Sequence, residues 1–306
     1  MRRRGVRGGA SRSLSGVIGA LCALTLFFIP SPPAQAASPE GRLVHLEFWS
    51  PTLNQEVGVR VYLPPGYDVE EAREERYPVV YLLHGLSGSS WDWLQIGQIN
   101  RVLDKRARGR NPRKVIAVSP NGGSSYWTQQ LDRVAAPGQN YGRFVGVDLV
   151  AEIDRRFRTL RRRRHRALVG ISMGGFGALS VGMLYPDRFG AAVSLSGALF
   201  TKVPDNKKAY RRVWGDPPVA AHFDRFSPYA LASSLPRSHP WPRIYIACGD
   251  GDHKTVRARS LAMHERLDQV GIPHVYSTGP GRHDWRYWIG SAPAWLDFLD
   301  AGFSSP

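Results

Sequence analysis

The segment Ala167–Leu184 (ALVGISMGGFGALSVGML) decides the fold of this chain. Ala167–Ile171 is continuously apolar, as in a strand covered on both faces of a parallel sheet, and Gly174–Leu184 favours a helix. Ser172 lies between them in a Gly-x-Ser-x-Gly motif (GISMG). Such a strand–turn–helix strains the serine backbone and exposes its hydroxyl. It also requires glycine at both flanking positions, because side chains there would collide. Ser172 is therefore the predicted nucleophile.

Apolar runs of strand length alternate with helical segments on both sides of this motif. Strands are predicted at Leu43–Phe48, Val57–Leu63, Val79–Leu83, Val115–Ser119, Ala167–Ile171, Ala191–Leu195, Ile244–Ala247 and His274–Ser277. Helices are predicted near Gly97–Arg106, Val145–Phe157, Gly174–Leu184, Lys254–Val270 and Ala292–Leu299. The first two strands suggest an antiparallel hairpin that leads into a mostly parallel sheet. This order predicts an α/β fold, a doubly wound sheet with helices on both faces.

The segment 198–242 does not fit this alternation. It contains Trp214, Trp241 and several prolines, and it joins two predicted strands. In a doubly wound sheet such an excursion lies over the carboxyl ends of the strands, where ligands bind. We therefore expect 198–242 to form an irregular cap in which Trp214 shapes an acyl pocket.

The N-terminal residues 1–36 have the three parts of a secretory signal. A basic start precedes the apolar run Leu14–Ile29, and prolines and the small residues of Ala34-Gln35-Ala36 follow it. The apolar run is shorter than the roughly 20 residues that a membrane-spanning helix needs. We expect a secreted protein with one domain over 37–306, and retention of the signal as an anchor is the alternative.

The chain is basic, with a formal net charge of +16. The signal contains five arginines and no acidic residue, so its removal leaves +11. This surplus could attract an anionic cell-envelope polymer. The densest basic run, Arg158–Arg166, is interpreted as a solvated loop. No base-reading or stacking motif surrounds it, so we expect no nucleic-acid partner.

Cys248 is the only cysteine that remains after removal of the signal. Its surroundings (IYIACGD) indicate a buried strand, in which cysteine is usually a small, inert apolar residue. No group of histidine, cysteine and acidic residues shows metal-ligand spacing. We expect no metal and no other cofactor.

In chains with this serine turn, an acid and then a histidine follow the serine in sequence. His283 lies in the loop GPGRHDW after the last predicted strand, where it can act as the general base. The acid should follow the strand Ile244–Ala247, and both Asp250 and Asp252 do so. We favour Asp252, because one turn past the strand lets its carboxylate reach back to the histidine. Asp250 is the alternative.

Two backbone N–H groups must hold the negative charge of a tetrahedral intermediate. Met173, directly after the nucleophile, supplies one, and the loop after Val79–Leu83 supplies the other. In that loop we favour Leu86, with Gly85 allowing the close approach. His84 precedes the turn and is interpreted as a packing residue.

With these residues placed, the chain resembles the esterase D and antigen 85 branch of the α/β-hydrolases. That branch includes feruloyl and acetylxylan esterases, S-formylglutathione hydrolase and mycolyltransferases. The resemblance covers nearly all of 37–306 and rests on Val61–Tyr67 (VYLPPGY), Tyr81–Trp93 (YLLHGLSGSSWDW), Ser119–Trp127 (SPNGGSSYW), Gly170–Leu179 (GISMGGFGAL), Cys248–Asp252 (CGDGD) and Gly281–Trp288 (GRHDWRYW). It implies the α/β-hydrolase fold, action on carboxylic esters without a cofactor, and no obligate protein partner. It matches the family's nucleophile, acid, histidine and oxyanion residues to Ser172, Asp252, His283, Met173 and Leu86.

The resemblance does not specify the substrate. Export argues against S-formylglutathione hydrolase, which is an intracellular activity. Hydrolysis of esters, carbohydrate- or lipid-linked ones included, is the favoured activity. The alternatives are acyl transfer to a sugar or cell-envelope acceptor and a secreted binding protein without catalysis. Trp127, Trp214 and Trp285 are candidate substrate contacts, because aromatic rings can stack on sugars or phenolic acyl groups.

Overall fold

The computed structural model describes residues 40–131, 139–204 and 208–304. The predicted signal, 1–36, lies outside these ranges. Within them, no helix is both long enough and apolar enough to span a membrane.

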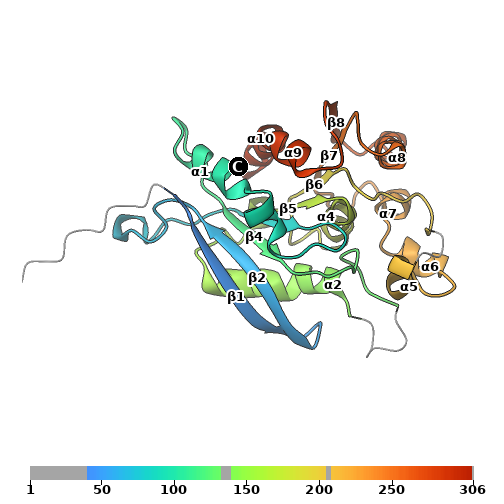
Figure 1. Cartoon of the computed structure of the whole chain (residues 1–306), viewed down its shortest axis with the longest axis horizontal. Helices are drawn as coiled ribbons and strands as arrows, with labels where there is room; N and C mark the ends of the chain where they lie inside the picture. Colours follow the sequence, from blue (N-terminus) through green and yellow to red (C-terminus); the bar gives the residue numbers. More distant parts are fainter. Residues whose placement is uncertain (1–39, 132–138, 205–207, 305–306) are drawn as a thin grey trace, which may run out of the picture. The chain divides into compact units, whose positions relative to one another are not determined.

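One mostly parallel sheet of eight strands forms the centre of the domain (Figure 1). The strands are β1 (Arg42–Ser50), β2 (Gln55–Leu63), β3 (Val79–Leu83), β4 (Ile116–Pro120), β5 (Arg166–Ile171), β6 (Ala191–Leu195), β7 (Arg243–Gly249) and β8 (His274–Gly279). Their order in the sheet is β1-β2-β4-β3-β5-β6-β7-β8. The pairs β1–β2 and β2–β4 are antiparallel, and all other neighbours are parallel. Each strand overlaps a predicted one, so the predicted doubly wound sheet is confirmed.

The strand order reverses at β3, because β4 lies on one side of it and β5 on the other. Such a switch point opens a crevice at the carboxyl ends of the strands, where α/β proteins place their ligands. Leu83, the last residue of β3, is paired with Gly170 near the end of β5. The loops that follow these two strands therefore begin side by side.

Helices cover both faces of the sheet. Successive side chains of a strand point to opposite faces, so each central strand contributes to two cores. In β5, Leu168 belongs to one core, and Val169 and Ile171 belong to the other. The first core draws side chains from η3 (Phe144–Leu149), α3 (Val150–Arg156), α4 (Met173–Leu184) and α8 (Lys254–Val270). The second draws them from α1 (Ile99–Ala107), α9 (Trp285–Gly290) and α10 (Ala292–Phe303).

Two predicted segments differ from the structure. The single helix predicted at Val145–Phe157 is the π-helical turn η3 continued by α3. The segment 198–242, predicted to be irregular, contains α5 (Lys208–Trp214), α6 (Ala220–Asp224) and α7 (Pro228–Ser234). Proline does not prevent α7, because Pro228 occupies its first turn and the Ser227 hydroxyl accepts a bond from the N–H of Ala230.

The basic run Arg158–Arg166 is only partly solvated, which corrects its interpretation as a solvent loop. Arg166 is 3% exposed, and its guanidinium lies 2.5 Å from the carboxylate of Asp154. Arg163 donates to backbone carbonyls in the segments that precede β6 and β7. Part of the run therefore stabilises the segments at the amino ends of the strands.

Two glycines allow the first turn of α4 to lie directly against the sheet. A Cβ atom at Gly170 would lie 1.9 Å from the carbonyl oxygen of Gly174, and one at Gly174 would lie 2.1 Å from that of Leu83. Both distances are far inside van der Waals contact, so the predicted requirement for glycine at both positions is confirmed. Ser172, between them, has φ 52° and ψ −114°, a backbone conformation that residues with side chains rarely adopt.

Gly174→Ala should destabilise the domain by about 3 kcal/mol, because the added methyl meets strand backbone that cannot move aside. Gly290→Ala is the matched control, since nothing lies within 4 Å of a Cβ atom there. The control should change the free energy of unfolding by less than about 1 kcal/mol. Urea unfolding measures both, and equal stabilities of the two variants would contradict the close approach.

Candidate active site

Four loops leave the carboxyl edge of the sheet and carry the predicted site residues. The loops after β3 and β5 carry the predicted oxyanion segment and the predicted nucleophile. In the β7–β8 pair, Gly249 lies opposite Gly279, so the loops that carry Asp252 and His283 leave the sheet together. Two backbone hydrogen bonds, both of 2.8 Å, then join these two loops beyond the strands.

Ser172 is the N-cap residue of α4, and its side chain is half-buried. Its N–H donates to the carbonyl of Leu195 at 3.0 Å, and its carbonyl accepts from the N–H of Ala198 at 2.9 Å. These two bonds hold the strained turn to the end of β6. The positive end of the α4 dipole also lies here, and it favours negative charge that develops beside the hydroxyl.

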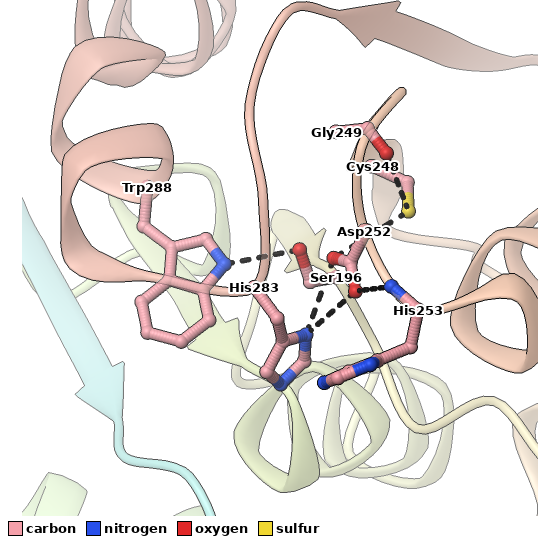
Figure 2. Close-up of polar contacts among 7 residues, drawn as sticks. All are labelled: Ser196, Cys248, Gly249, Asp252, His253, His283 and Trp288. Atoms are coloured by element: carbon pink, nitrogen blue, oxygen red, sulfur yellow. Dashed lines mark hydrogen bonds and ion pairs between the residues drawn. The ribbon is translucent and has the colours of Figure 1, made fainter.

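His283 and Asp252 form a hydrogen-bonded pair (Figure 2). Nδ1 of His283 lies 3.0 Å from Oδ1 and 3.2 Å from Oδ2 of Asp252. The Asp252 side chain is 0% exposed, whereas the imidazole is 21% exposed. The backbone N–H of His253 donates to the same carboxylate at 2.6 Å. With Nδ1–H bound to the acid, Nε2 is the nitrogen that can accept a proton.

The surroundings of Asp252 favour its charged form. Burial alone would raise the pKa of this carboxyl. Hydrogen bonds from His283 and Ser196, the attraction of the imidazole and the His253 N–H outweigh burial, so the pKa lies below its ordinary value. The carboxylate of Asp250, in contrast, makes no hydrogen bond or ion pair within the described ranges. The structure thus places Asp252 beside the histidine.

Ser196 and Trp288 support this pair, a role that the sequence analysis gave to neither of them. Ser196 is fully buried just after β6, with φ 48°, and its N–H donates to the Ala247 carbonyl at 2.7 Å. The indole Nε1 of Trp288 donates to the Ser196 hydroxyl at 3.0 Å. The same ring lies edge-on to His283, with centroids 5.2 Å apart. The only sequence signal was the short spacing between His283 and Trp288.

Cys248 lies behind the acid, with Sγ 3.8 Å from Oδ2 of Asp252. Burial, together with the charge of Asp252, raises the pKa of this thiol to about 12. The prediction of a buried cysteine within a strand is confirmed, and the sulfur stays a neutral thiol near neutral pH.

The predicted oxyanion residues come from two separate segments next to Ser172. Met173 is the first residue of α4 and is fully buried, and Leu86, in the loop after β3, is 40% exposed. Gly85 brings that loop to the serine, since a Cβ atom there would lie 3.6 Å from Cβ of Ser172. Over the described residues no hydrogen bond joins Ser172 to His283. In free enzymes this bond is often long and tightens with substrate.

Two of the three predicted aromatic contacts lie in the core. Trp127 and Trp214 are both 0% exposed, and Trp214 packs against Phe176 of α4 with ring centroids 5.9 Å apart. We correct both from substrate contacts to interior residues, because surrounding side chains close off both ring faces. Trp285 is half-buried, and its ring contacts those of Trp93 and Trp288. It stays a candidate contact.

One group in the described part of the chain has the side chains of a metal site. Ligand atoms of His264, Asp268 and His274 all lie within 4.8 Å of one another. However, Nδ1 of His264 is only 2.7 Å from Nε2 of His274. Two nitrogen ligands of a tetrahedral zinc ion lie roughly 3.3 Å apart. This contact is therefore a hydrogen bond, and it lies on α8 and β8, outside the four loops of the site.

Comparison with known proteins identifies relatives over most of the chain. The model of the putative esterase family matches residues 50–298. An acetyl esterase of Caldicellulosiruptor saccharolyticus is 28% identical over 273 residues, which are 83% of this chain and 97% of that protein. An endo-1,4-β-xylanase/feruloyl esterase of Xylanibacter ruminicola is 28% identical over 78% of this chain, but only 30% of that protein is covered. A solved ferulic acid esterase has a TM-score of 0.74 at 24% identity and covers 87% of this chain and 99% of its own. The resemblance and the α/β-hydrolase fold predicted from the sequence are confirmed.

Asp252 should make the stability of the domain depend on pH in acid. Because folding lowers the pKa of this carboxyl, its stabilising contribution is complete above the ordinary aspartate pKa, about 4. It is lost as the pH falls through the lower folded-state pKa. Asp252→Asn removes this titration, so its free energy of unfolding should fall less than that of the wild type between about pH 6 and pH 2.

Urea unfolding across this pH range measures the effect. Asp250→Asn is the matched control and should keep the pH dependence of the wild type, because its carboxylate lacks such partners. A wild-type pH dependence in Asp252→Asn would contradict a buried carboxylate paired with His283.

Proposed function

We propose a serine esterase mechanism for this chain, which belongs to the putative esterase family. Membership and the acetyl esterase relative establish the coarse activity, hydrolysis of ester bonds. One observation supports the mechanism best. The hydrogen-bonded His283–Asp252 pair lies on the same edge of the sheet as the strained Ser172.

The first step is formation of an acyl-enzyme. Nε2 of His283 takes the proton of the Ser172 hydroxyl while Oγ attacks the ester carbonyl. Asp252 keeps the proton of the histidine on Nδ1 and stabilises the imidazolium, without itself taking a proton. His283 then gives its proton to the leaving alcohol.

Two backbone N–H groups hold the carbonyl oxygen as it becomes negative. Met173 supplies one at the positive end of α4, and Leu86 supplies the other from the loop after β3. Water then attacks the acyl-enzyme while His283 takes its proton, and His283 gives that proton to Oγ of Ser172 as the acid product leaves.

We take water as the acyl acceptor and a small or phenolic acyl group as the substrate class. The acetyl esterase, matched over 97% of its length, supports this choice. The feruloyl esterase name carries less weight, because the chain spans only 30% of that larger protein. Acyl transfer would use the same acyl-enzyme. Adding a sugar acceptor to the assay and following its acylation distinguishes transfer from hydrolysis.

The proposed site of action is outside the cytoplasm. The basic start, the apolar run Leu14–Ile29 and the small residues before position 37 support export. The positive charge that remains after cleavage would favour association with an anionic envelope polymer.

Ser172→Ala should lower kcat for nitrophenyl acetate by on the order of 10⁶-fold, and His283→Ala by a similar factor, because the two act as a unit. A phosphonate ester should label the wild type but not Ser172→Ala. The melting temperature of each variant checks its folding. Retention of more than a few per cent of activity in Ser172→Ala would rule out the assigned nucleophile. A wild type that neither turns over ester nor takes up phosphonate would indicate a binding protein.

Asp252→Asn should lower kcat on the same ester by about 10⁴-fold, since loss of the acid leaves part of the catalysis. Asp250→Asn, two residues away, should change kcat by less than about tenfold, since this carboxylate does not contact the histidine. Steady-state kinetics of both variants at neutral pH measures the difference. A larger loss in Asp250→Asn than in Asp252→Asn would reverse the assignment.

A further inference from the structure

Three consecutive backbone carbonyls, of the last residue of β3 and the two residues after it, each accept a hydrogen bond from a ring N–H. Nε1 of Trp93 donates to Leu83 at 3.1 Å, Nε1 of Trp127 to His84 at 3.3 Å, and Nδ1 of His84 to Gly85 at 2.7 Å. All three rings are 0% exposed. We infer that His84, supported by Trp93 and Trp127, is a positioning residue that aims the Leu86 N–H into the oxyanion site. This inference rests on the proposed function.

The geometry of the peptide bond links the carbonyl of Gly85 to the N–H of Leu86. A trans peptide is planar, so its C=O and N–H point in opposite directions. The bond from His84 to the Gly85 oxygen therefore fixes the direction of the Leu86 N–H, which points from the opposite edge of the same peptide group. The same oxygen also accepts from the N–H of Gly88 at 3.1 Å, which closes the turn. Two donors hold the carbonyl edge of this peptide group, and the opposite edge carries the N–H proposed for catalysis.

His84 can donate a hydrogen bond to the Gly85 carbonyl and accept one at Nε2 in only one protonation state. Its Nε2 accepts a hydrogen bond from the backbone N–H of Gly122 at 3.0 Å, so that nitrogen carries no proton. The proton must then lie on Nδ1, where it is donated to Gly85. Burial lowers the pKa of His84, which favours the neutral ring. The ring thus bridges the loop after β3 and the loop after β4 with both nitrogens bonded.

The loop is also pressed against the helix that follows the nucleophile. A Cβ atom at Gly174 would lie 2.1 Å from the oxygen of Leu83 and 2.7 Å from that of His84. The second proposed donor, Met173, directly precedes Gly174. Both proposed oxyanion donors therefore belong to one tightly packed piece of backbone, which His84 and the two indoles hold from the interior.

A packing role alone does not account for this arrangement. An apolar side chain could fill the volume without the cost of removing two imidazole nitrogens from water. Instead both nitrogens meet backbone partners on the oxyanion loop and its neighbour. We therefore infer that His84, which was expected only to pack, also orients the backbone of this loop. Such preorganised donors act on the transition state, because the charge develops only there.

The test compares His84→Leu with His84→Asn in the full chain. Leucine fills similar space without a donor, while the asparagine amide nitrogen occupies about the position of Nδ1. We expect His84→Leu to lower kcat for nitrophenyl acetate about tenfold to a hundredfold with KM within about threefold. Affinity for a boronic acid that forms a tetrahedral adduct with Ser172 should fall in parallel, and inhibition by acetate should not change. His84→Asn should recover most of the loss.

His165→Leu is the matched control, because His165 is also buried, at 9% exposure, but lies at the opposite end of β5 from Ser172. It should leave kcat and boronate affinity unchanged. An unchanged kcat in folded His84→Leu overturns the inference. The inference is also overturned if His84→Asn does not recover the kcat lost in His84→Leu, or if His84→Leu loses affinity for boronate and acetate equally.

If the leucine variant does not fold, Trp127→Phe decides the question, since it removes the N–H that holds the His84 carbonyl and keeps an aromatic ring in the core. A lower kcat at unchanged KM supports the inference, and an unchanged kcat overturns it. Failure of the proposed function would give a different result. Ser172→Ala would then keep its activity, whichever residue stands at position 84.

Discussion

The contact between the first turn of α4 and the end of β3 is the constraint on which the rest of the site depends. It brings Gly174 so near the Leu83 carbonyl that no side chain fits. Because β3 and β5 are neighbours, the same contact joins the turn of the proposed nucleophile to the loop of the proposed oxyanion donor. Strain at a residue such as Ser172 costs on the order of 1–3 kcal/mol and persists only where surrounding structure enforces it. Here two large cores and two backbone bonds to the β6 end enforce it.

The buried carboxylate of Asp252 requires hydrogen-bond donors, and residues from several loops supply them. A carboxylate with 0% exposure is costly unless hydrogen bonds replace its lost water. His283, Ser196 and the His253 N–H supply them, and they lower the pKa of Asp252 in spite of burial. The donors come from the loops after β6, β7 and β8, so the order of parallel strands is what assembles the pair.

Tryptophan contributes to this site mainly from the interior. Trp93 and Trp127 donate their indole N–H groups to carbonyls at the end of β3 and the start of the loop that follows it, and Trp288 donates to Ser196 beside Asp252. Each of these three rings fixes one polar atom with its N–H while its apolar surface fills the core. The enrichment of aromatic residues in these segments therefore reflects how the loops are held more than how a substrate is stacked.

The sequence by itself determined the sheet, the nucleophile turn and the family, because apolar runs and glycines act locally. A strand covered on both faces must be apolar, and the motif around Ser172 tolerates only glycine at Gly170 and Gly174. Tertiary structure decided what depends on contacts between distant segments. The carboxylate that meets His283 follows from the pairing of β7 with β8, since Asp250 and Asp252 are equally acidic in the sequence. Whether Trp127 and Trp214 face solvent or core is likewise set by segments far away in the chain, because burial is a property of the packed molecule and not of the residue.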